Sequence, residues 1–113
     1  MYDMFQQVLA DALAWAKKKY AGASPQKLAA FANSVAYGMT GWAGGYGGPS
    51  VREHVAGNML RQKVLLTPNL SFEEACAEVE GLVFGPLTPA HQAVFKREHT
   101  FDDDPADLEA LHK

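Results

Sequence analysis

Apolar residues recur at a spacing of three and four positions along most of this chain, and this periodicity limits its possible folds more than any other feature. One such run covers residues 2–20 and collects Phe5, Val8, Leu9, Ala12, Leu13, Ala16 and Tyr20 on one helix face. A second run collects Leu28, Phe31, Ala32, Val35, Met39 and Trp42. A third collects Val51, Val55, Ala56, Met59, Leu60 and Val64, and a fourth collects Phe72, Ala75, Cys76, Val79, Leu82 and Val83; these faces are expected to form the core. No stretch of five residues alternates convincingly with period two. We therefore expect an all-α protein without a sheet.

Helix-capping residues mark where the predicted helices start. Ser24 followed by Pro25 is an N-cap with proline at the first helical position, and Thr88-Pro89 repeats this pattern. The spacing predicts capping boxes at Ser50–Glu53 and Ser71–Glu74. Helices are thus expected over about 2–20, 25–42, 51–66, from 72 to just before Gly85, and from 89 onward, with a short one over 106–111. The prediction is a single domain, residues 1–113, in which about five helices and a short C-terminal helix form one bundle.

The segment from Gly38 to Gly48 holds six of the ten glycines, together with Met39, Trp42 and Tyr46. It does not match a phosphate-binding loop, because no lysine follows the glycines and the preceding element is a predicted helix. Two interpretations stay open: a loose connection between helices, or a close approach of the second helix to a neighbour. Tyr37 lies about 180° from Leu28 around the helix, so we expect it at a surface or an interface.

Residues that could carry chemistry are present, but they do not form a recognisable site. The four histidines match neither H-E-x-x-H nor a cysteine–histidine framework, so no metal or cofactor is expected. Cys76 has apolar neighbours on its helix face and glutamates nearby, which is typical of a buried core thiol. No serine or cysteine pairs with a base in a known motif, and Glu78 and Glu80, on a helix rich in carboxylates, are expected to face water. We therefore expect no catalytic residues and no enzyme activity.

Charge is distributed unevenly between the two halves of the chain. Residues 1–63 contain seven basic and three acidic residues, whereas residues 64–113 contain three basic and ten acidic ones. This asymmetry favours head-to-tail contacts or a partner with a basic patch, and it argues against general nucleic-acid binding. The apolar runs are too short for a membrane helix, and the N-terminus lacks the pattern of a signal peptide. A cytoplasmic protein is expected.

The apolar and aromatic residues exceed what five short helices are expected to bury, which favours a protein that binds another protein. In size and composition, though in no specific motif, the chain resembles small bacterial or phage-borne regulators that mask a surface of a transcription regulator or host enzyme. We expect a homodimer, with residues 2–20 as the dimer element. The predicted contact residues are Tyr2, Phe5, Tyr37, Met39, Trp42 and Tyr46.

Two alternatives belong to other functional classes. Residues 25–42 and 51–66 flank a turn and carry Arg52, Arg61 and Lys63, so a helix-turn-helix-like DNA-binding protein is one alternative. The turn is longer than usual for that motif, and few basic residues face the expected groove. The other alternative is an enzyme or ligand-binding bundle with a pocket near the glycines.

Overall fold

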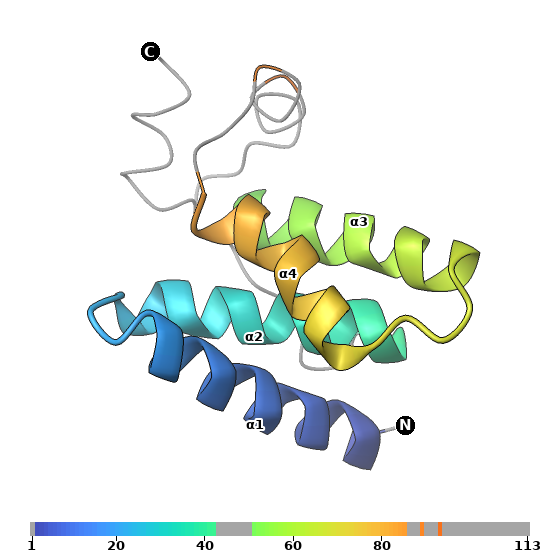
Figure 1. The fold of residues 1–113 in the computed structure, drawn as a ribbon, viewed down its shortest axis with the longest axis horizontal. Helices are drawn as coiled ribbons and strands as arrows, with labels where there is room; N and C mark the ends of the chain where they lie inside the picture. Colours follow the sequence, from blue (N-terminus) through green and yellow to red (C-terminus); the bar gives the residue numbers. More distant parts are fainter. Residues whose placement is uncertain (1, 43–50, 86–88, 90–92, 94–113) are drawn as a thin grey trace.

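A computed structural model describes residues 2–42, 51–85, 89 and 93, and this part of the chain forms four α-helices and no strand (Figure 1). They are α1 (Tyr2–Lys19), α2 (Pro25–Thr40), α3 (Val51–Leu66) and α4 (Phe72–Val83). The all-α prediction is confirmed for these residues, and the four predicted helices lie close to their expected bounds. Apart from residues 89 and 93, the predicted fifth helix lies outside the described residues, as do the short C-terminal helix and the capping serine Ser50.

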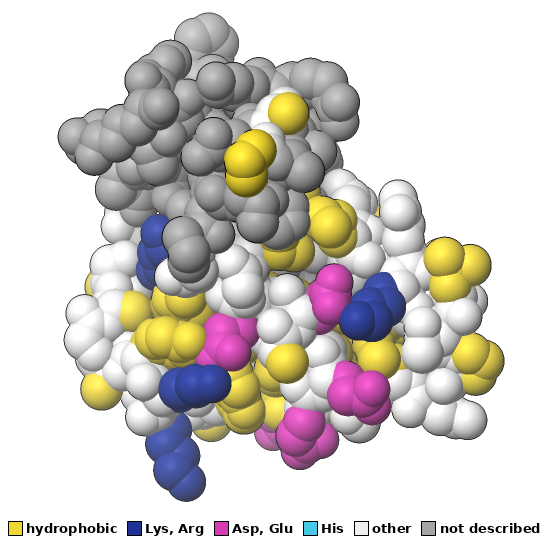
Figure 2. All heavy atoms as spheres, turned by 45° about the horizontal axis from the view of Figure 1, so that its top comes forward, with side chains coloured by type: hydrophobic (Ala, Val, Ile, Leu, Met, Phe, Trp, Pro, Cys, Tyr) yellow, Lys and Arg dark blue, Asp and Glu magenta, His cyan; other side chains and the backbone are white. Residues whose placement is uncertain are grey.

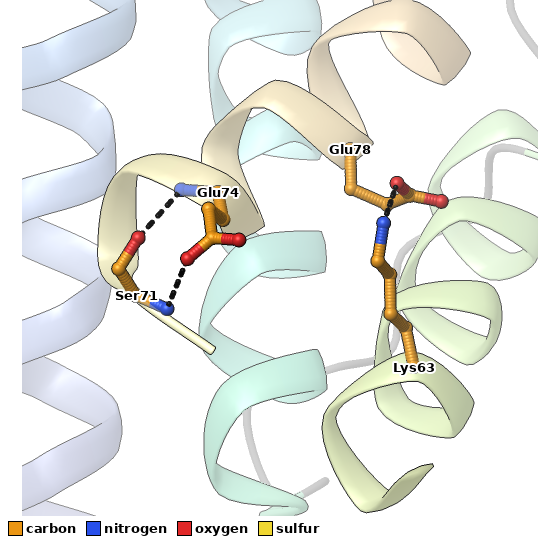
Figure 3. A network of polar contacts seen from close by, with 4 residues as sticks. All are labelled: Lys63, Ser71, Glu74 and Glu78. Carbon is orange, nitrogen blue, oxygen red and sulfur yellow. Dashed lines mark hydrogen bonds and ion pairs between the residues drawn. The ribbon is translucent and has the colours of Figure 1, made fainter. Parts of the chain in front are cut away.

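The helix starts follow the capping chemistry expected from the sequence. The Ser24 hydroxyl accepts a hydrogen bond from the Lys27 amide at 3.1 Å, with Pro25 at the first position of α2. At α4, Ser71 Oγ accepts from the Glu74 amide at 3.1 Å, and the Glu74 carboxylate accepts from the Ser71 amide at 3.3 Å (Figure 3). The predicted capping box at Ser71 is confirmed. Both devices satisfy amide groups that a helix start would otherwise leave unpaired.

α2 is the central helix of the bundle. It packs against α1 on one side and against α3 and α4 on the others (Figure 1). All four helices contribute to one hydrophobic cluster: Ala12, Ala16, Leu28, Phe31, Ala32, Val35, Ala56, Leu60, Ala75, Cys76, Val79, Leu82 and Val83. The alanines allow the helix axes to approach closely, because they fill little space between the backbones.

The inward faces predicted for α1, α2 and α4 are confirmed, but one prediction for α3 is wrong. Met59 was expected in the core, whereas its side chain is 37% exposed. α3 instead packs through a face that includes Val55, Ala56 and Leu60, all nearly inaccessible to solvent. Met59 precedes Leu60 by about 100° around the helix, which turns it away from that contact face.

Aromatic rings pack the end of α4 against α1 and α2, near the point where α1 ends and α2 begins. Phe84, directly after α4, stacks on Tyr20 with ring centroids 4.0 Å apart and an interplanar angle of 10°. It also contacts Phe31 of α2 at 5.6 Å, and Phe31 in turn stacks on Trp15 of α1 at 5.2 Å. This chain of rings joins three helices through side chains distant in sequence.

Candidate functional site

Two of the six predicted contact residues, Phe5 and Trp42, contact each other at the opposite end of the bundle, where α1 begins and α2 ends. The rings of Phe5 in α1 and Trp42, just after α2, lie 4.9 Å apart at an angle of 57°. Phe5 is only 1% exposed, while Met39 and Trp42 are partly buried. These side chains therefore also hold α1 against α2 within one chain. The Tyr2 side chain and Tyr46 lie outside the described part of the protein.

Tyr37 occupies the side of α2 that α3 covers. Its hydroxyl donates a hydrogen bond to Asn58 Oδ1 at 3.3 Å, and the residue is half-buried. The sequence placed Tyr37 away from the Leu28 stripe but did not show that α3 would pack there. In a bundle, the central helix has neighbours on more than one side, so a residue opposite its main apolar stripe can still be covered.

Gly38 lets α2 and α3 approach each other closely. A Cβ atom at this position would lie 2.4 Å from both Cγ and Cδ2 of Leu60, and 2.7 Å from its Cβ. Only a hydrogen fits in that space. Of the two interpretations of the glycine segment, the close approach of the second helix to a neighbour is confirmed at Gly38.

Arg61 of α3 completes the C-terminal end of α2. Its Nη1 donates to the carbonyl oxygen of Gly38 at 3.2 Å and lies 3.5 Å from that of Met39. Gly41 ends α2 with a φ of 74°, a left-handed conformation that suits glycine, and its amide donates to the Tyr37 carbonyl at 2.7 Å. A guanidinium near these carbonyl groups also opposes the partial negative charge of the helix end.

Two of the three basic residues considered for DNA binding are therefore engaged within the chain. Arg61 binds the end of α2, and Lys63 forms an ion pair with Glu78 of α4 at 2.8 Å (Figure 3). This contact raises the pKa of the Lys63 ammonium, chiefly through its hydrogen bond to Glu78. The Arg52 side chain lies outside the described residues.

The exposed large apolar side chains of the described residues lie on the first turn of α1 and on the second half of α3, the segments near the end of the bundle that holds Trp42. They are Met4 (58% exposed), Met59 (37%), Leu65 (66%) and Leu66 (82%), and we call them the apolar end. Met4 precedes Phe5, which contacts Trp42, so the first turns of α1 lie at the end of α2. Met59 lies between Asn58 and Leu60, which contact Tyr37 and Gly38 near the same end of α2.

The exposure of Leu65 and Leu66 has a simple geometric cause. The contacts of Tyr37 with Asn58 and of Gly41 with Arg61 show that α2 and α3 run in the same direction, with Arg61 level with the end of α2. α3 continues past this level, so its last turn projects beyond α2 (Figure 1). The leucines on that turn have no α2 side chains beside them. The sequence contained a signal, since three consecutive apolar residues, 64–66, cannot all face one side of a helix.

Two carboxylates lie in the first turn of α4, which follows the exposed leucines of α3 in the chain. Glu73 and Glu74 are exposed at the start of α4, one helical turn before Glu78. On the face shown in Figure 2, acidic side chains lie among hydrophobic ones, with further hydrophobic side chains at the right-hand edge. Among the described residues, this start of α4 therefore gives the neighbouring surface a negative charge.

Contacts of Lys19 and Tyr20 with Glu80 join the end of α1 to α4, at the end of the bundle opposite Trp42. The Tyr20 hydroxyl donates to Glu80 Oε2 at 2.6 Å, and Lys19 Nζ lies 2.5 Å from the same oxygen. Burial acts to raise the pKa of Glu80, but the hydrogen bonds from Lys19 and Tyr20 together hold it below its ordinary value. The hydrogen bond to Glu80, then burial, raise the pKa of Tyr20 to about 12. Glu80, expected from the sequence to face water, is instead partly buried and joins two helices.

Cys76 is fully buried in the core, as the sequence predicted. Burial, with smaller contributions from Glu73 and Glu80, raises the pKa of its thiol to about 12. The protonated thiol is a poor nucleophile and a poor metal ligand. Within the described residues, no three side chains of His, Cys, Asp or Glu come together as a metal site.

Comparisons with protein-family models, curated proteins and solved structures gave no match to this chain. Among the helices in the described ranges, none combines the length and the apolar character needed to span a membrane.

Proposed function

We propose that this chain is a small protein-binding regulator or inhibitor, which masks a surface of a target protein and performs no catalysis. The observation that supports this function is the exposure of the adjacent leucines Leu65 and Leu66 at the end of α3, with Met59 exposed on the same helix and Met4 exposed near the start of α1. Single exposed apolar residues are common on protein surfaces, but a group of them at one place is typical of an interaction surface.

The packing around Trp42 adds a second argument. Trp42 is partly buried and rests on Phe5, which is itself buried, so the indole is held in place before any partner arrives. A fixed aromatic side chain loses little conformational freedom on binding, and tryptophan is enriched among residues that dominate binding energy. The predicted contacts Met39 and Trp42 thus lie beside the apolar end, and their role toward a partner is part of this proposal.

Burying the exposed leucines would supply enough free energy to bind a partner protein. Fully burying one leucine side chain contributes about 1.5–3 kcal/mol, and Leu65 and Leu66 both have most of their surface still available. We further propose that the protein acts in the cytoplasm. A homodimer built on α1 is included in this proposal, since Met4 lies on that helix.

Affinity capture from a native lysate, using the full chain, tests the proposal. We expect the wild type to retain a partner that Leu65→Ala/Leu66→Ala and Trp42→Ala lose, while their far-UV circular dichroism stays helical. Gln62→Ala, an exposed change on the same helix, is the matched control and should retain the partner. If the three changes leave the captured proteins the same as for wild type, the proposal is wrong. Light scattering on the same samples measures whether a second copy is bound.

DNA binding through α3 ranks lower, because the internal contacts of Arg61 and Lys63 reduce the positive charge available to phosphates. A gel shift at low salt decides between the two functions. Retardation of DNA that is lost in Arg52→Ala would favour the DNA-binding alternative over a protein-binding regulator.

A further inference from the structure

The corner between α3 and α4 combines exposed leucines with exposed carboxylates. We define the α3–α4 corner as Leu65, Leu66, Glu73 and Glu74. The ion pair of Lys63 with Glu78 sets the register between the two helices. Glu74 lies one turn before Glu78 in α4, on the side where α4 begins (Figure 3). Leu66 lies about one turn beyond Lys63, at the end of α3, so both residues lie on the side of the ion pair where the chain passes from α3 to α4.

The charge of Lys63 acts on Glu74 as well as on Glu78, so near the corner one described cation offsets only part of the charge of three carboxylates, those of Glu73, Glu74 and Glu78. Lys63 is paired with Glu78, and Lys19 is paired with Glu80 at the far end of α4. Glu74 is held in place by its hydrogen bond from the Ser71 amide, yet it remains exposed, as Glu73 does. A ligand that covers the leucines therefore meets two carboxylates at the edge of the contact.

We propose that the α3–α4 corner binds a basic amphipathic helix of a partner protein. The apolar side of that helix covers Leu65 and Leu66, and its lysine or arginine residues face Glu73 and Glu74. This inference rests on the proposed protein-binding function and specifies the chemistry of the partner. Complementary charge around an apolar centre favours such a partner over neutral or acidic ones.

A second copy of the chain fits the same corner less well. Two corners related by a two-fold axis would place the same carboxylates of both copies at one interface, where like charges repel. A basic helix meets no such repulsion. Met59 and Leu66 are seven residues apart and so lie on one side of α3 across two turns, which suits a short helix lying along α3.

A binding experiment with two designed peptides tests the partner chemistry. The probe is a labelled 18-residue amphipathic helix of leucine and lysine, and the matched peptide has glutamate in place of every lysine. Fluorescence anisotropy with the full chain should show saturable binding of the lysine peptide, weakened by added salt, and at least tenfold weaker binding of the glutamate peptide.

Variants locate the binding on the protein. Glu73→Gln/Glu74→Gln should weaken binding of the lysine peptide about fivefold, as expected for two exposed charge contacts. Glutamine at position 74 can still form the capping box with Ser71, so the start of α4 is kept. Leu65→Ala/Leu66→Ala should weaken it by about tenfold or more, from the apolar area lost. Asp3→Asn/Asp11→Asn removes the same charge from α1 and should leave binding unchanged.

Several results would overturn the inference. One is equal binding of both peptides that still depends on the leucines; this would refute the basic partner while agreeing with apolar recognition. Failure of the lysine peptide to bind also refutes it, and the capture experiment then decides on the proposed function separately. An equal loss in the α1 control would show nonspecific charge attraction. A dimer that Leu65→Ala/Leu66→Ala dissociates would assign the corner to a second copy.

Discussion

Replacing Gly38 by alanine tests the most restrictive contact in the bundle. The new Cβ would lie 2.4 Å from two side-chain atoms of Leu60 and 2.7 Å from its Cβ. Carbon atoms pack best at about 3.5–4.0 Å, so α2 and α3 must separate by roughly 1 Å. Leu60 cannot relieve the clash by a rotamer change alone, because its Cβ is fixed to the α3 backbone.

The expected magnitude follows from two opposing effects. Overpacking a well-filled core costs about 1–3 kcal/mol, and the contact with the Leu60 Cβ places Gly38→Ala near the upper limit. Alanine gains about 1 kcal/mol over glycine in helix propensity. The free energy of unfolding should therefore fall by about 2 kcal/mol, which lowers the melting temperature by roughly 8 °C or more in a chain of this size.

Gly81→Ala is the matched control, because Gly81 also lies in a helix but has nothing within 4 Å of its Cβ position. This variant should raise the free energy of unfolding by about 0.5–1 kcal/mol through propensity alone. Urea unfolding followed by circular dichroism measures both variants. A Gly38→Ala protein as stable as the Gly81→Ala protein would refute the close packing of α2 on α3.

A double variant separates the clash from other causes. Leu60→Ala alone removes a buried side chain and should cost about 2–5 kcal/mol. In Gly38→Ala/Leu60→Ala the contacts of the new methyl group with Cγ and Cδ2 of residue 60 are gone, and only the contact with the Cβ at 2.7 Å remains. The combined loss should be smaller than the sum of the single losses by about 1 kcal/mol or more, within the range measured for contacting residues. Simple additivity would contradict the proposed contact.

Four further predictions concern polar groups and the single cysteine. Arg61→Met should lower the free energy of unfolding by about 1–2 kcal/mol, because the end of α2 loses a charged donor, and Arg61→Lys should restore part of it in urea unfolding. Because the pKa of Glu80 is lowered in the folded state, the ionised carboxylate adds to the free energy of unfolding above the unfolded-state pKa, and this contribution is lost as the pH falls through the folded-state pKa. Glu80→Gln should therefore make the free energy of unfolding depend less on pH on the acid side, and an unchanged slope would contradict this. The pKa of Tyr20 is raised to about 12, so the stability contributed by its protonated hydroxyl is lost as the pH rises from about 10 past 12. Tyr20→Phe should remove the tyrosine ionisation that occurs at the highest pH in an ultraviolet titration. Buried Cys76 should react with a thiol reagent only as fast as the protein opens, so rapid labelling of the folded chain would refute its burial.

The helices and their inward faces could be predicted from the sequence because their causes are local. Ser24 and Ser71 cap helices within three residues of themselves, and the apolar spacing in α2 selects its buried face without knowledge of its neighbours. The burial of Cys76 followed from the same spacing. These features depend on bonds and periodicities that extend over a few residues of chain.

Which helix covers which face was decided only by the tertiary structure. The sequence did not show that α3 would pack on the Tyr37 side of α2, that Gly38 would receive Leu60, or that Arg61 would reach the end of α2. Met59 was assigned to the core for the same reason: its orientation depends on how α3 rotates around that glycine contact.

The candidate site shows the same division. The sequence itself determined that aromatic residues lie at the end of α2 and that acidic residues begin α4. Only the packed helices show that α3 extends beyond α2 and leaves Leu65 and Leu66 exposed at the end of α3. Local patterns fix where a helix starts and which side is apolar, whereas relative helix position depends on side-chain shapes that meet across the core.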